Sequence, residues 1–170
     1  TEIYTEVDTL SLHDAPPILI LAIFVLFIAM TAIFSWYEGS GLMDDPHQWE
    51  YTALISGWMD DGEVLGKSEI SQLDFFLYAI KFHPLFPSSM MVFFLLLLFF
   101  IGYPFKNKKY VMPLMAFYAM ILIFSFMIIP NEQGTGVFLN SVRSAALILI
   151  VLSTLIWFRD RKTVEVKTSG

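Results

Sequence analysis

Residues 18–37 read ILILAIFVLFIAMTAIFSWY, an apolar run of 20 residues without a charged side chain. A helix needs about 20 such residues to cross the hydrocarbon core of a bilayer. Three further apolar runs follow at residues 88–105, 110–129 and 141–158, and Arg143 is the only charged residue inside any of them. A soluble core could explain one such run, but four in this length predict membrane spans. Because open strands leave unsatisfied edges in lipid, we expect the spans to be α-helices.

The composition agrees with an integral membrane protein. The chain has 170 residues, of which 56% are hydrophobic and 15% charged, and its mean hydropathy is +0.66. Soluble domains hold about 45–50% apolar and about 25% charged residues. The absence of cysteine excludes disulfides, thiol catalysis and iron–sulfur ligation, and the net charge of −6 argues against nucleic acid as a partner. The predicted fold class is therefore an all-α integral membrane protein with four transmembrane helices.

Residues 1–18 resemble a translated sequencing adapter rather than native protein. Residues 2–5 (EIYT) match one part of such an adapter, and residues 9–15 (TLSLHDA) with Pro17 and Ile18 match another. Segments that arise from processing should be left out of fold reasoning. Without the four acids of this segment, the net charge falls to −2.

Lysine and arginine near the span ends predict the orientation. Seven of the ten basic residues lie in the loop at residues 106–109 or in the tail at residues 159–170. The positive-inside rule places both of these segments, and with them both termini, in the cytoplasm. The segment at residues 38–87 and the turn at residues 130–140 are then external.

The external segment is the one elaborate region. Residues 49–56 alternate imperfectly between apolar and polar side chains, as a half-buried strand does, and residues 60–65 offer a turn and a return strand, so a β-hairpin is expected. Ser68 or Ser71 is expected to cap an amphipathic interfacial helix that ends near Phe82. We expect Trp49, Tyr51 and Trp58 to bury against this helix, because an aromatic left exposed forgoes roughly 1.5–3 kcal/mol of burial.

Few residues are candidates for a catalytic or ligand-binding site. For each of them, a purely structural role is favoured over a functional one. A metal site around His47 is one candidate, but its spacing from Asp44, Asp45 and Glu50 matches no known set of metal ligands. The residues at 44–46, Asp-Asp-Pro, are also typical of a turn. His83 is expected to anchor the chain at the interface rather than to sense pH. Arg143 is expected to pair with Glu132 or Asp74, and is a candidate counter-ion for Glu38. No catalytic, cofactor or metal site is predicted. The candidate interaction or structural residues are Trp36, Glu38, Trp49, Tyr51, Trp58, Asp74, His83 and Arg143.

Three stretches of the external segment carry a family resemblance. These are SWYEGS at residues 35–40, PHQWEYT at residues 46–52 and LDFFLYAIKFHPLFP at residues 73–87. Together they resemble the YjdJ-like small membrane proteins of Gram-positive spore formers. The resemblance implies a bacterial plasma-membrane protein and carries no activity with it. The last two predicted spans are expected to be additional to those of shorter relatives.

Three classes of function remain open. The first is a non-enzymatic multi-pass plasma-membrane protein that acts through its external segment, on the bilayer surface or on a membrane-protein partner or second copy. The alternative is a small oligomeric transporter or channel component, although the nearly uncharged spans disfavour ion coupling. A membrane enzyme that uses the external carboxylates ranks lowest, because no motif for nucleophilic or metal-assisted catalysis occurs.

Overall fold

All regular structure in the part of the chain that the computed structural model describes, residues 15–59, 66–102 and 108–168, is helical. Most of the adapter-like segment lies outside these residues, but α1 already begins at Ala15. The elements in chain order are α1 (Ala15–Gly39), η1 (Ser40–Asp44), η2 (Pro46–Gln48), α2 (Trp49–Thr52), α3 (Leu54–Met59), η3 (Lys67–Glu69), α4 (Gln72–Phe82), α5 (Leu85–Gly102), α6 (Lys108–Met127) and α7 (Gln133–Thr168).

Three helical stretches among the described residues are long and apolar enough to cross a membrane. They are Ile18–Asp44, Leu85–Gly102 and Gln133–Arg159. The expected span at residues 110–129 also forms a helix, α6, but its apolar part, Val111–Met127, is shorter. The helix stops before Pro130, whose ring disfavours helical backbone at the preceding residue. The count of four spans is therefore not supported, and the structure supports three.

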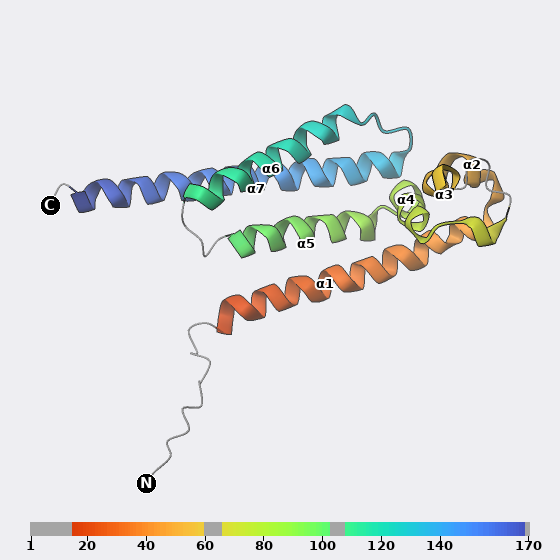
Figure 1. Ribbon diagram of the computed structural model, residues 1–170, viewed down its shortest axis with the longest axis horizontal. Helices are drawn as coiled ribbons and strands as arrows, with labels where there is room; N and C mark the ends of the chain where they lie inside the picture. Colours follow the sequence, from red (N-terminus) through yellow and green to blue (C-terminus); the bar gives the residue numbers. More distant parts are fainter. Residues whose placement is uncertain (1–14, 60–65, 103–107, 169–170) are drawn as a thin grey trace, which may run out of the picture.

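The long helices lie alongside one another, and the short ones gather at one end (Figure 1). α1 packs against α5, α5 packs against α7, and α7 packs against α6. We call residues 40–59 and 66–82 the cap. Within the cap, α4 lies across the ends of the long helices and contacts α1, α5 and α7, and α2 and α3 lie beyond it. The start of α1 and the end of α7 lie at the opposite end of the bundle.

Two glycines allow α4 to lie directly on the ends of α1 and α7. A Cβ atom on Gly39, the last residue of α1, would fall 2.0 Å from the carbonyl oxygen of Phe75. A Cβ atom on Gly134, in the first turn of α7, would fall 2.0 Å from the carbonyl oxygen of Lys81. Both clashes are with backbone, which cannot move aside as a side chain can. α4 is therefore held between one helix from each half of the chain.

The expected β-hairpin is wrong in its first half, because residues 49–59 form α2 and α3. Over eight residues, an alternating pattern does not separate a strand from short helical turns. The deciding group is distant in sequence: the carboxylate of Asp74 accepts hydrogen bonds from the backbone N–H groups of Ile55 and Ser56, at the start of α3. The expected turn and return strand, residues 60–65, lie outside the described residues.

The expected helix that ends near Phe82 is confirmed as α4. Ser71 caps it, and its side chain accepts a hydrogen bond from the backbone N–H of Leu73. The buried residues of α4 are Asp74, Phe75 and Ala79, whereas Leu73 is 58% exposed. Phe75 lies against α1, at Gly39 and at the ring of Trp36.

The close contact at Gly134 predicts opposite effects for two glycines of α7. Gly134→Ala should destabilise the protein by about 2 kcal/mol, because its methyl group would overlap the backbone of Lys81. Gly136→Ala is the matched control: its Cβ would lie 3.8 Å from the nearest atom, on Pro130, so the variant should gain up to about 1 kcal/mol of helix propensity. Thermal unfolding in detergent, followed by circular dichroism, measures both. Equal melting temperatures would contradict the predicted contact.

Candidate functional site

Asp74 organises the cap from its interior. Its side chain is fully buried, and it accepts hydrogen bonds from the N–H groups of Ile55 and Ser56 at 2.9 Å each and from the Ser56 hydroxyl at 2.5 Å. The Ser56 hydroxyl in turn accepts a bond from the N–H of Ser71, the residue that caps α4. A carboxylate at the start of a helix is favoured by the helix dipole and by the free N–H groups there. Asp74 thus joins α3 to α4.

Trp49 holds the opposite side of the cap. Its indole N–H donates a hydrogen bond of 2.8 Å to the carbonyl oxygen of Leu42, in η1. Its ring packs against a buried apolar cluster, whose members are Leu42, Ala53, Ile70 and Phe75. The cap therefore has a small apolar core of its own.

Lys81 connects the end of α4 to the end of α2. Its ammonium group donates hydrogen bonds to the carbonyl oxygen of Tyr51, at 2.5 Å, and to the hydroxyl of Thr52, at 3.0 Å. The last carbonyl groups of a helix have no partner within it, so a cation is favourable there. Partial burial lowers the pKa of Lys81 from its usual value, and the negative charge of Glu132 opposes this shift.

A cleft of about 640 Å³ lies next to Lys81, between the cap and the α6–α7 turn. We call it the cap cleft. It contains charges of both signs, on Lys81 and Glu132, and large apolar side chains that are open to the surroundings: Ile129 is 81% exposed and Tyr51 is 61% exposed. The lining residues are Gln48, Tyr51, Thr52, Leu54, Leu77, Ile80, Lys81, Ile128, Ile129, Asn131, Glu132 and Thr135.

The structure brings several of the candidate residues together around α4. Trp36 lies against Phe75, with their ring centroids 6.3 Å apart, and Trp49 and Asp74 belong to the cap interior. Glu38 is half-buried, and one of its carboxylate oxygens is buried without a hydrogen-bond partner. His83 follows the last residue of α4, and its ring lies 6.3 Å from that of Tyr78.

The expected burial of three aromatics holds only for Trp49, and only in part. Trp58 is 85% exposed, and Tyr51 borders the cap cleft instead of packing inside the cap. Asp74 of α4 binds the first turn of α3, at Ile55, whereas Trp58 lies in the last turn of α3. The hydrogen bond therefore does not bring Trp58 onto α4. The expected anchoring of both residues on α4 is therefore wrong.

Arg143 does not pair with Asp74 or Glu132. Its guanidinium group donates hydrogen bonds to the carbonyl oxygen and hydroxyl of Ser125, in the last turn of α6, and to the side chain of Asn140. It also lies over the ring of Phe126, 4.5 Å from the centroid. Because Arg143 satisfies a free carbonyl at the end of α6, it holds the α6–α7 pair together instead of serving as a counter-ion for the cap.

Sequence reasoning missed Lys81 and Ser56, and it expected Glu132 to pair with Arg143 rather than to line a cleft. Lys81 is one of only two lysines in the acid-rich segment at residues 38–87. A lysine among so many acids could have been recognised as a candidate for a specific contact. Ser56 and Glu132 carry no comparable signal, since their roles depend on contacts with distant parts of the chain.

Comparison with known proteins identifies the family. Residues 18–106 match a domain of unknown function, DUF4306. The chain belongs to the DUF4306 family. It is 36% identical over 75 residues to the uncharacterized protein YjdJ of Bacillus subtilis (strain 168), and the match covers 44% of this chain and 68% of YjdJ. The expected resemblance to YjdJ is thus confirmed. No solved structure matches the chain.

The family match divides the cap cleft between two parts of the chain. Residues 18–106 include the cap and α5, whereas α6 and α7 follow them. Lys81 and Tyr51 therefore come from the DUF4306 part of the chain, and Ile129 and Glu132 come from beyond it.

The hydrogen bonds of Asp74 predict a large difference between two acids of the cap. Asp74→Ala should cost about 3 kcal/mol, because it leaves buried N–H and hydroxyl donors without an acceptor. Asp44→Ala, the control, removes only an exposed ion pair with Lys67 and should cost less than about 1 kcal/mol. Denaturant unfolding in detergent, followed by tryptophan fluorescence, measures both. Similar losses in the two variants would show that Asp74 does not hold the cap together.

Proposed function

We propose that this DUF4306 protein is a non-enzymatic plasma-membrane protein that binds a partner protein in the cap cleft. The three apolar helices support the membrane location. A non-catalytic role is supported by the state of Lys81, the basic group of the cleft, whose ammonium already donates to Tyr51 and Thr52 and so is not a free proton acceptor. The proposal rests most heavily on the combination of opposite charges and exposed apolar side chains in one cleft.

We further propose that α6 crosses the bilayer with its neighbours. α5 runs away from the cap and α7 starts beside it, so α6 must return over the same distance. Its apolar part, Val111–Met127, extends about 25 Å at 1.5 Å per residue, and spanning helices begin at about 17 residues. The positive-inside rule then places the cap outside the cell and both termini in the cytoplasm. The reason is that the start of α6 and the end of α7, whose sequences are rich in lysine and arginine, lie at the end remote from the cap.

The proposed orientation is tested by cysteine labelling, because the chain has no natural cysteine. Asn131→Cys is exposed in the α6–α7 turn and should react with an impermeant maleimide on intact cells. Asn107→Cys, which lies between Lys106 and Lys108 in the sequence, should react only after the cells are opened. Position 134 is unsuitable, since a side chain there would strike Lys81. Equal labelling of positions 131 and 107 on intact cells would contradict this orientation.

The chemistry of the cap cleft favours a protein over a lipid surface. A lipid chain could cover Leu54 and Ile129, but it would leave Gln48, Asn131 and Glu132 without hydrogen-bond partners. A polypeptide can supply apolar side chains together with donors and acceptors, as protein interfaces do. Exposed apolar side chains bordered by polar groups mark such interfaces.

Photo-crosslinking from two matched leucines tests partner binding. Leu54 and Leu73 are both 58% exposed, but only Leu54 lines the cap cleft. With p-benzoylphenylalanine at position 54, cells should yield a protein adduct of one defined mass. Position 73 should not give this adduct, and Ile129→Asp should abolish it at position 54 by placing a charge in the cleft. Adducts with lipid alone, or the same protein adduct from both positions, would contradict the proposal.

A further inference from the structure

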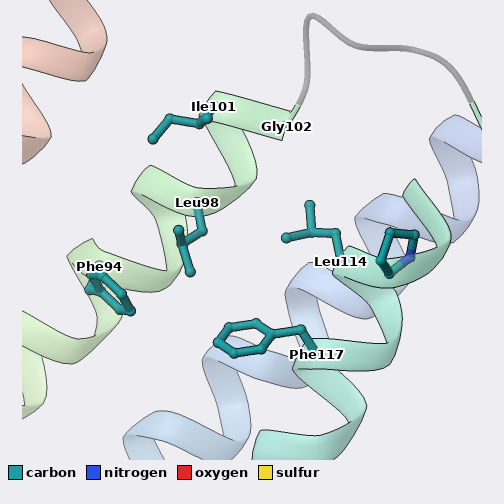
Figure 2. Close-up of a pocket in the computed structure, with 7 residues that line it drawn as sticks. Phe94, Leu98, Ile101, Gly102, Leu114 and Phe117 are labelled. Carbon is teal, nitrogen blue, oxygen red and sulfur yellow. The ribbon is translucent and has the colours of Figure 1, made fainter. Parts of the chain in front are cut away.

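A second hollow lies far from the cap, between α5 and α6. It has a volume of about 560 Å³, and its lining consists of Phe94, Leu98, Ile101, Gly102, Pro113, Leu114 and Phe117. We call it the α5–α6 groove. Figure 2 shows Phe94, Leu98 and Ile101 on one wall and Leu114 and Phe117 on the other, with open space between them. Every side chain of the lining is apolar, so only an apolar occupant fits.

Next to the groove, α5 and α6 are joined by a buried hydrogen bond. Tyr118 of α6 is fully buried, and its hydroxyl donates a hydrogen bond of 3.1 Å to the carbonyl oxygen of Leu95, in α5. Leu95 and Tyr118 form a buried cluster with Leu149 of α7, and Leu114 and Phe117 pack against this cluster. α5 and α6 are therefore in contact at Leu95 and Tyr118 and lie apart in the turns that line the groove. The space between them follows from how the two helices pack.

Two lysines begin the helix that forms one wall of the groove. The groove reaches Gly102, the last residue of α5, and Pro113 and Leu114, close to the start of α6. α6 begins with Lys108 and Lys109, and neither α5 nor α6 contains an acidic residue. Lysines directly beyond an apolar helix attract anionic lipid headgroups, by about 1 kcal/mol for each lysine near the surface.

We propose that the α5–α6 groove binds one acyl chain of an anionic phospholipid, whose phosphate-bearing headgroup is held at the end of the groove where α6 begins. The apolar lining supplies the affinity for the chain, and the lysines supply the preference for an anionic headgroup. A second copy of this protein fits less well, because a parallel symmetric pair would bring the same lysines together. This lipid site is independent of partner binding in the cap cleft.

Native mass spectrometry of the full chain in detergent tests the proposal with two lipids that share the same acyl chains. The anionic probe is phosphatidylglycerol and the zwitterionic probe is phosphatidylcholine. The parent protein should retain one phosphatidylglycerol molecule with clear preference. The double variant Lys108→Gln, Lys109→Gln should lose about 30-fold in affinity for phosphatidylglycerol, which corresponds to about 1 kcal/mol for each lysine, and should bind phosphatidylcholine as before. Lys67→Gln, which removes a lysine of the cap, should change neither affinity.

Filling the groove should have a different effect. Leu98→Trp places a larger side chain between the two walls and should reduce the retention of both lipids by about tenfold. Ile33→Trp is the matched control, because Ile33 is 64% exposed on α1 and lies outside the groove. If Leu98→Trp fails to fold, the lipid preferences of the parent and of the Lys108→Gln, Lys109→Gln variant are sufficient to test the proposal. Equal retention of the two lipids by the parent, equal losses in the two tryptophan variants, or a lipid-free dimer that Leu98→Trp dissociates would each overturn the proposal.

Discussion

The backbone contact between α4 and the ends of α1 and α7 is the constraint on which the rest of the structure depends. At Gly39 and at Gly134 the neighbouring backbone occupies the space that a Cβ atom would need. Two glycines that lie 95 positions apart in sequence thus fix one short helix across the end of the bundle. Since α4 carries both Asp74 and Lys81, its position determines where α2 and α3 lie.

This arrangement explains how a short segment between apolar helices becomes a folded cap. Asp74 fixes the start of α3, Lys81 fixes the end of α2, and Trp49 closes an apolar cluster that includes Phe75. The cap is small, so its own apolar core could not hold it together without the bundle below. The same arrangement leaves Tyr51 and Leu54 open along a cleft that also contains charged groups, and this surface is where we place partner binding.

The sequence predicted the parts of the fold that local patterns determine. Apolar runs with at most one charged residue predicted α1, α5 and α7. Either Ser68 or Ser71 was expected to cap α4, and Ser71 does so. The sequence failed where a distant group decides. Asp74 holds the start of α3 and Lys81 the end of α2, where a strand was expected. Ser125 takes hydrogen bonds of Arg143 that were expected to go to an acid. Nothing near Gly134 in the sequence indicates that the backbone of Lys81 lies against it. Of the candidate site, Trp49 and Asp74 were named from the sequence, whereas the cap cleft required the folded structure.

Amide hydrogen exchange of the detergent-solubilised protein is the most direct test of the central claim that the cap is a folded unit anchored on α4. The account predicts slow exchange at Ile55 and Ser56, whose N–H groups bind the buried Asp74. Trp49→Ala should speed exchange across residues 40–59 by about tenfold or more, because the ring packs on the cap core. Trp58→Ala should not, since that ring is 85% exposed. Fast exchange at residues 40–59 in the parent, unchanged in Trp49→Ala, would show that these residues are a loose linker and would contradict the account.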